Sequence, residues 1–337
     1  NRAPGAVPTQ LMAQYYTQRA TAGLLITEAT AISHQGQGYS DVPGLYGLDQ
    51  LDGWKHITQS VHAAGGKIVM QLSHVGRVSH TDLQPGGGQP VAAKTKTVLI
   101  KDGVPAFVET SAPRALALDE LPGIVQSYAD AARAAVDIAG FDGVEIHGAN
   151  GYLLDQFMKS GSNQRQDAYG GSIENRARLL LEVVRAITSA VGGGRCAIRL
   201  SPVTTANDAF DAAPQPLFDY VVRQLASLGL AYLHIIEGAT GGARDLPERP
   251  FDYPALKAAY RQAGGQGAWM VNNGLDKLLA EQALAHGAEL VAFGRPFIAN
   301  PDLVQRLRLD APWNTGDRPT FYGGGAKGYT DYPTLST

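Results

Sequence analysis

Three polar side chains follow one short apolar stretch in the middle of the chain. Residues 143–146 are typical of a strand, and His147, Asn150 and Tyr152 come directly after them, where a strand should give way to a loop. The imidazole and the amide could donate hydrogen bonds to one carbonyl or nitro oxygen, and the phenol could deliver or accept a proton. Because the carboxyl ends of strands carry the chemistry in β/α architectures, we expect an active site here. The same short motif is also compatible with a histidine that bonds backbone carbonyls and a tyrosine that only packs.

Two further polar residues lie in or at the end of expected strands. Gln71 is near the end of the run Lys67–His74, and an amide at a strand end suits the polar edge of a heterocycle. Arg199 lies inside an apolar strand, where a charge is costly unless it has a partner. Arg199 should therefore face a site and meet an anion, or else form an internal salt bridge with a carboxylate such as Glu145.

Glycine turns after the last two expected strands indicate a phosphate site. Asn273 and Gly274 follow one strand, and Gly294 and Arg295 follow the next. In barrels, the loops after the last two strands commonly hold a phosphate between backbone N–H groups and a helix N-terminus. The glycines allow close backbone approach and the arginine supplies charge. An ordinary pair of glycine turns is the alternative interpretation.

Apolar strand-like runs alternate with amphipathic helical segments along the chain. Near-continuous apolar character indicates parallel strands buried on both faces, and the expected strands are Leu24–Ala31, Lys67–His74, Gly143–Asn150, Cys196–Pro202, Ala231–Gly238, Ala268–Gly274 and Glu289–Pro296. Expected helices span Pro122–Ala139, Ser172 (as N-cap) to Ile187, Pro216–Leu228, Tyr253–Gln262, Leu275–His286 and Pro301–Leu309. The alternation predicts an α/β fold, either a (β/α)₈ TIM barrel or an open doubly wound sheet. No Gly-x-Gly-x-x-Gly follows the first run, which disfavours the second.

The expected barrel is one strand short and carries one insertion. A closed (β/α)₈ barrel needs one strand more than the runs above supply, and the chain opens on the loop-like Asn-Arg-Ala-Pro-Gly. We therefore expect the first strand to be missing from the sequence. The segment 76–118, after the strand that ends near His74, breaks the alternation and contains possible hairpin strands at Thr95–Ile100 and Ala106–Glu109. It is interpreted as a lid on a single domain that spans residues 1–337.

Composition excludes several classes of partner. Lys and Arg number 28 against 31 Asp and Glu, for a net charge of −3, without the basic stripe of a nucleic-acid-binding protein. No apolar run approaches the roughly 20 residues of a membrane helix. The single cysteine, Cys196, excludes an internal disulfide and fits a cytoplasmic location. The histidine spacings match no metal-binding motif, so we expect no metal.

Several longer motifs together resemble the Old Yellow Enzyme family of flavin-dependent ene-reductases. These are His-Gly-Ala-Asn-Gly-Tyr-Leu-Leu-Asp-Gln-Phe at 147–157, Ser-Asn-Gln-Arg at 162–165, Asp-x-Tyr-Gly-Gly-Ser at 167–172, Glu-Asn-Arg at 174–176 and Ala-Phe-Gly-Arg-Pro-Phe-Ile-Ala-Asn-Pro at 292–301. The segment 321–333 is similar to the bacterial branch that contains N-ethylmaleimide, pentaerythritol tetranitrate and morphinone reductases. The resemblance covers nearly the whole chain.

The resemblance implies a barrel that binds FMN, which NADPH or NADH reduces and an activated alkene reoxidises. By motif, His147 and Asn150 would bind the carbonyl, imide or nitro oxygen of the alkene, and Tyr152 would give the proton. The matching positions for the flavin and its phosphate are Ala29, Gln71, Arg199, Asn273, Gly274, Gly294 and Arg295. Tyr39 and Tyr322 match aromatic residues beside the substrate, and Ser73 stands where relatives often have Trp, which should widen the pocket.

Two other functions stay open from the sequence. One is a phosphate-binding barrel isomerase or aldolase without flavin, which should have a catalytic Lys or Glu at a strand end. The other is a truncated, non-catalytic barrel fragment, because a barrel that lacks a strand has an open edge. The expected partner is a small-molecule alkene, and the protein is expected to be a monomer or homodimer.

Overall fold

The computed structural model describes residues 1–90, 96–101 and 104–335. One curved sheet of parallel strands forms its centre, in the order β1-β3-β6-β7-β8-β9-β10, with β2 also paired to β3. The bounds are β1 Leu25–Ile26, β2 Thr30–Ala31, β3 Ile68–Ser73, β6 Gly143–Gly148, β7 Cys196–Leu200, β8 Tyr232–Ile236, β9 Ala268–Asn272 and β10 Leu290–Ala292. The expected parallel α/β architecture is therefore confirmed.

Register places the chemically important side chains on one face of this sheet. Glu145 pairs with Gln71 on one side and Ala197 on the other, and one step further along the same face His147 pairs with Arg199. Arg199 in turn pairs with His234. Because side chains alternate between the two faces of a strand, the apolar residues between these positions face the opposite way. The polar residues thus share the inner face, and the aliphatic residues meet the helices.

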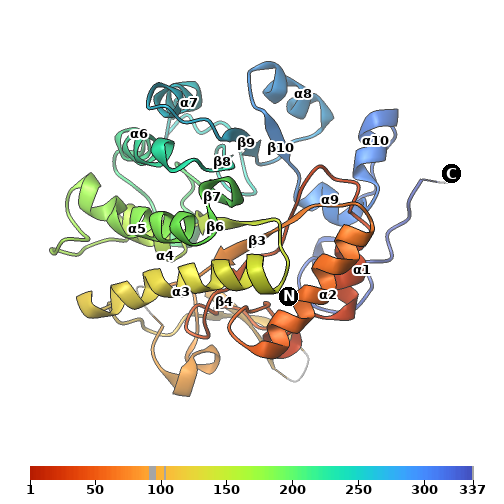
Figure 1. Cartoon of the computed structure of the whole chain (residues 1–337), viewed down its shortest axis with the longest axis horizontal. Helices are drawn as coiled ribbons and strands as arrows, with labels where there is room; N and C mark the ends of the chain where they lie inside the picture. The colour runs from red at the N-terminus through yellow and green to blue at the C-terminus, as the bar shows by residue number, and fades with distance from the viewer. Residues whose placement is uncertain (91–95, 102–103, 336–337) are drawn as a thin grey trace.

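Helices surround the sheet on its outer side, as Figure 1 shows for α2, α3, α5, α6 and α7. The α-helices are α1 Gln10–Thr17, α2 Leu48–Ala63, α3 Leu121–Arg133, α4 Leu153–Met158, α5 Ile173–Val191, α6 Pro214–Leu225, α7 Tyr253–Gln262, α8 Lys277–Ala285, α9 Arg295–Ala299 and α10 Leu303–Leu309. The expected N-cap is confirmed, since the Ser172 hydroxyl accepts from the Asn175 N–H at the start of α5. On α5 itself, Leu180, Val184 and Ile187 are fully buried.

The first expected strand differs most from the sequence expectation. Leu24–Ala31 forms two short pieces that both pair in parallel with β3, and the register shifts by one residue between them. At this break the Thr27 hydroxyl donates to the Glu28 carbonyl and accepts from the Gln71 N–H. Helices α1 and α2 were not expected. In addition, the helix expected to reach Ala139 changes to a π-helical turn at Ala134–Ile138.

The sheet has two ends in the part of the chain that the structure describes. β1 and β10 are the two ends of the strand order, and within the described residues no pairing joins them. Leu290 in β10 is 36% exposed, unlike the fully buried β6 and β8. The expected barrel, which the sequence analysis gave as one strand short, is found as an open, barrel-like parallel sheet.

The insertion after β3 contains the expected hairpin. Two 3-10 turns, Thr81–Leu83 and Pro85–Gly87, precede the antiparallel strands β4 Lys96–Lys101 and β5 Val104–Glu109. Thr95, which the expected first hairpin strand included, lies outside the described residues.

Candidate functional site

A sharp loop after β6 brings the three candidate catalytic residues together. His147 is the penultimate residue of β6, and both Asn150 and Gly151 have left-handed backbone conformations, with φ of 59° and 72°. A Cβ on Gly151 would lie 2.2 Å from the Ala206 carbonyl oxygen, so only glycine fits there. Tyr152 then caps α4, and its ring meets the His147 ring edge-on with centroids 5.0 Å apart. The sequence prediction that these side chains leave one strand end together is confirmed.

The side chain of Asn150 has a fixed orientation. Its Oδ1 accepts from the Thr240 hydroxyl at 2.6 Å, which leaves the Nδ2 group to donate elsewhere. The backbone is held as well, because the Asn150 N–H donates to Ser201 Oγ and its carbonyl accepts from Asn207 Nδ2. Asn150 is therefore set as a hydrogen-bond donor before any ligand arrives.

His147 is neutral near pH 7. Burial, with the Arg199 charge as the next cause, lowers the pKa of His147 to about 3. Its Nδ1 is buried and has no hydrogen-bond partner among the residues that the structure describes. A neutral imidazole carries one N–H donor and one acceptor, so His147 can hold an oxygen by hydrogen bonding without adding a full positive charge.

Tyr152 is held in its protonated form. Burial is the largest cause that raises the pKa of Tyr152 above its usual range. Its hydroxyl lies 3.0 Å from that of Tyr39, and the two rings pack edge to face. A phenol that keeps its proton at neutral pH is suited to be a general acid rather than a base.

Beneath these residues a buried polar network fills the inner face of the sheet. The Glu145 carboxylate is completely buried, accepts from Gln71 Nε2 at 2.6 Å, and lies 2.8 Å from His234 Nδ1. Arg199 is beside it, and the Glu145 charge opposes the fall that burial causes in the pKa of Arg199. The sequence alternatives for Arg199 were an anion site or a salt bridge to Glu145. The carboxylate instead hydrogen-bonds Gln71 and His234, while its charge acts on Arg199.

The residues expected to bind phosphate follow the neighbouring strands β9 and β10, but the Asn273 side chain bonds the backbone of another loop. Its Oδ1 accepts from the Gly241 N–H, and its Nδ2 donates to the Glu237 and Ala239 carbonyls. The Asn273 side chain thus organises the loop after β8. Gly274, with a φ of 65°, and exposed Arg295 remain able to meet a ligand.

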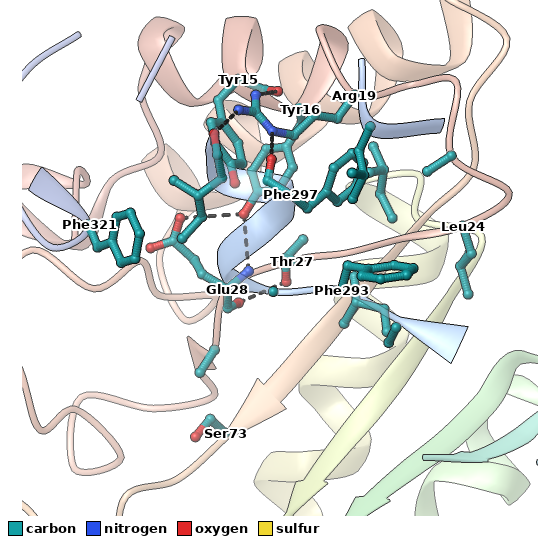
Figure 2. Close-up of a pocket in the computed structure, with 18 of the residues that line it drawn as sticks. Tyr15, Tyr16, Arg19, Leu24, Thr27, Glu28, Ser73, Phe293, Phe297 and Phe321 are labelled. Carbon is teal, nitrogen blue, oxygen red and sulfur yellow. Dashed lines mark hydrogen bonds between the residues drawn. The ribbon is translucent and has the colours of Figure 1, made fainter. Parts of the chain in front are cut away.

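A cavity of about 1050 Å³ is lined by Thr27, Glu28 and Ser73 on one side and by Phe293 and Phe297 on the other (Figure 2). Its lining includes six of the predicted site residues: Ala29, Tyr39, Ser73, Tyr152, Gly294 and Tyr322. The other seven, which are Gln71, His147, Asn150, Arg199, Asn273, Gly274 and Arg295, are not part of this lining. From Tyr152 the cavity continues between β1 and β10 toward Tyr15 of α1 and toward Arg19, which follows α1. Tyr322 is 73% exposed.

Comparison with known proteins identifies the family. Residues 1–314 match the family described as NADH:flavin oxidoreductase / NADH oxidase. The chain belongs to this family. Its cofactors are a flavin and a nicotinamide nucleotide, and the expected Old Yellow Enzyme membership is confirmed.

Similar proteins include plant and bacterial members. A putative 12-oxophytodienoate reductase 2 from Oryza sativa subsp. japonica is 46% identical, over 99% of this chain and 88% of the relative. The structure of morphinone reductase in complex with tetrahydroNAD is 45% identical with a TM-score of 0.92, covering 99% of this chain and 91% of that one. An Old Yellow Enzyme homologue from Zymomonas mobilis is 39% identical with a TM-score of 0.91, covering 99% and 93%.

Sequence reasoning missed several residues that position the site of this Old Yellow Enzyme relative. Thr240 and Asn207 hold Asn150 from two other loops, and their polar types alone gave no signal. His234 could have been found, because it lies inside an apolar strand in the same way as Arg199.

Metal-binding clusters and membrane-spanning helices are both absent from residues 1–90, 96–101 and 104–335. No cluster of three or more His, Cys, Asp or Glu side chains is arranged there to hold a metal ion. No helix there has the length and apolar character needed to cross a bilayer.

Proposed function

We propose that this protein, as one domain, uses FMN and NADPH or NADH to reduce the C=C bond of alkenes activated by a carbonyl, imide or nitro group. One arrangement carries the proposal: a neutral imidazole, an oriented amide donor and a protonated phenol, from His147, Asn150 and Tyr152, leave a single strand end. Reduction of such an alkene is assisted by hydrogen-bond donors to its activating oxygen and by an acid that gives a proton to carbon.

The inner face of the sheet suits FMN. Among the described residues, Ser73 Oγ, Arg199 Nε and Asn272 Oδ1 are buried without hydrogen-bond partners, and Ser73 lines the cavity. A heterocycle with alternating donors and acceptors along its edge would satisfy such groups. Gln71, Arg199 and the backbone near Ala29 would hold the ring, with Gly274, Gly294 and Arg295 at the phosphate. When bound, FMN supplies the hydride to the alkene β-carbon.

The residues of the chain divide the remaining work. His147 and Asn150 donate hydrogen bonds to the activating oxygen of the alkene, and these bonds strengthen as negative charge develops there. Tyr152 then transfers its phenolic proton to the α-carbon. Tyr39, hydrogen-bonded to Tyr152, keeps that hydroxyl in place.

The visible spectrum of the purified protein, before and after addition of FMN, is the first test. Flavin absorption bands, their bleaching by NADPH or NADH without oxygen, and their return with 2-cyclohexenone or N-ethylmaleimide are the expected results. A phosphate-binding isomerase or aldolase without flavin would give no such bands even with added FMN, and that outcome would reject the proposal. A non-catalytic fragment would show the bands without their return.

We expect His147→Ala to weaken the binding of phenolic ligands, whose oxygen resembles the enolate, by about 10- to 100-fold. Loss of one hydrogen bond to a charged oxygen costs about 1.5–3 kcal/mol. The long-wavelength charge-transfer absorption that a phenol gives with oxidised flavin measures this affinity. Unchanged affinity would contradict the oxygen-binding role of His147.

We further propose that the insertion 76–118 is a lid on the cavity.

We also propose that one more parallel strand belongs between β1 and β10 and closes the barrel. Support comes from the two unpaired sheet ends, the exposed Leu290 and the cavity that runs between these strands. Backbone groups at an open edge lack partners. Amide hydrogens of β10 should exchange rapidly in residues 1–337 and slowly in a chain that carries the additional strand. Equal exchange would contradict a missing strand.

A further inference from the structure

Glu145 is the centre of the polar network, although it has no role in the reaction proposed above. It lies on the inner face of β6, two residues before His147, and is 0% exposed. One of its oxygens accepts from Gln71 and the other lies against His234 Nδ1. Burial raises the pKa of Glu145, but the interactions with His234, Arg199 and Gln71 outweigh burial and hold the pKa below its usual range. Glu145 is thus a carboxylate at neutral pH.

The carboxylate determines which end of Gln71 is free. An ionised carboxylate can only accept hydrogen bonds, so the Gln71 NH₂ group must point toward it. The Gln71 oxygen is then turned away and is available as an acceptor. With neutral Glu145, or without it, the two ends of the amide could exchange places. Glu145 therefore fixes Gln71 as an acceptor for an N–H group at the edge of a ring.

The same carboxylate places a negative charge beside Arg199. The effect is mutual: the Arg199 charge contributes to lowering the pKa of Glu145, and the Glu145 charge opposes the lowering of the pKa of Arg199. A buried pair of opposite charges presents a much smaller field than the arginine alone, because the interior screens charges weakly. Any anion that forms near Arg199 is therefore stabilised less than it would be by a lone guanidinium.

We propose that Glu145 is a positioning residue that keeps the Gln71 amide oxygen facing the flavin and holds down the reduction potential of bound FMN. This rests on the function proposed above, with Gln71 and Arg199 beside the ring. Reduction by two electrons and one proton leaves one negative charge on the flavin. Glu145 disfavours that charge, so the reduced flavin is a stronger hydride donor to the alkene than Arg199 alone would allow.

Glu145→Gln tests the charge at nearly constant shape. The flavin of this variant should be easier to reduce, with the ratio of reduced to oxidised flavin at a fixed potential raised at least tenfold, or about 30 mV for a two-electron couple. Potentials of FMN-loaded protein are measured against a reference dye. Asp211→Asn is the matched control, because Asp211 is a buried carboxylate paired with Arg176 in the helical layer. It should change stability and leave the potential unchanged.

Glu145→Asp separates the two roles and supports the test if the Gln variant does not fold. The shorter side chain keeps the charge but draws the carboxylate back from Gln71, so FMN affinity should fall about tenfold while the potential stays close to that of the unaltered protein. A potential unchanged in Glu145→Gln, or an FMN affinity unchanged in Glu145→Asp, would overturn the proposal. Failure of the unaltered protein to bind FMN would instead reject the proposed function itself.

Discussion

Replacement of Tyr152 by Phe is expected to slow alkene reduction by about 100- to 10,000-fold, the usual contribution of a positioned general acid. The variant removes the hydroxyl that lies 3.0 Å from Tyr39 OH and leaves the ring against His147. Reduction of the flavin by NADPH or NADH needs no proton from this residue, so its rate should remain nearly unchanged. Anaerobic stopped-flow measurement of the two half-reactions separates these effects.

A matched variant and the pH dependence sharpen this test. Tyr128→Phe removes another buried hydroxyl, but from α3 in the helical layer and away from the cavity, and it should leave both half-reactions intact. Because the pKa of Tyr152 is raised above about 10, its proton should remain available from about pH 6 to pH 9. The rate of alkene reduction should not fall over this range through loss of that proton. Collapse of flavin reduction in Tyr152→Phe would show that the proton-donor assignment is wrong.

Replacement of Lys159 by Met should lower the free energy of unfolding by about 3–5 kcal/mol, as expected when a buried ion pair loses one partner. Lys159 and Asp155 are both 0% exposed, and Lys159 Nζ donates to Asp155 Oδ2 at 2.9 Å and to the Ser201 and Thr204 carbonyls. The same Asp155 oxygen accepts from the Gly151 N–H in the loop after β6. Urea denaturation measures the loss of stability.

The sign of the pH dependence distinguishes a lost ion pair from a simple cavity. Burial is the largest cause that raises the pKa of Asp155, and Lys159 opposes it. Without Lys159 the pKa of Asp155 rises further, so the folded protein binds a proton more readily than the unfolded chain does. The stabilisation that comes from protonated Asp155 is complete below the unfolded pKa of about 3.9. It is lost as pH rises through the pKa that Asp155 has in the folded protein.

The stability deficit of Lys159→Met should therefore be smaller at about pH 5 than at about pH 8. A deficit that does not change with pH would contradict an uncompensated Asp155. Arg133→Met is the control, because its partner Asp130 is exposed and a surface pair contributes under about 1 kcal/mol.

Most strands could be predicted from the sequence because a parallel strand that is buried on both faces consists of a run of apolar residues. The runs that begin at Gly143, Cys196 and Ala268 start where β6, β7 and β9 start. The prediction failed at Leu24–Ala31, because hydrogen bonds of Thr27 with Glu28 and with the distant Gln71 interrupt the strand. A contact between residues far apart in the chain leaves no local pattern.

The site was predictable in its residue types and less so in its contacts. His147, Asn150 and Tyr152 leave one strand together, as expected, because their spacing is local. The use of the Asn273 amide within the loop after β8 could not be read from sequence, since its partners are backbone atoms of residues 237–241. The same holds for the Glu145 contact with His234, which joins strands β6 and β8 across the inner face.

The hydrogen bonds that hold Asn150 from two other loops have a consequence for protein engineering. The side-chain oxygen of Asn150, the residue proposed to bind the substrate, accepts from Thr240 in the loop after β8, and its backbone carbonyl accepts from Asn207 in the loop after β7. A change of selectivity can therefore arise from residues that never touch the substrate. Loops exchanged between relatives to alter the range of alkenes should be transferred as a pair, because either loop alone would leave Asn150 without one of these two hydrogen bonds.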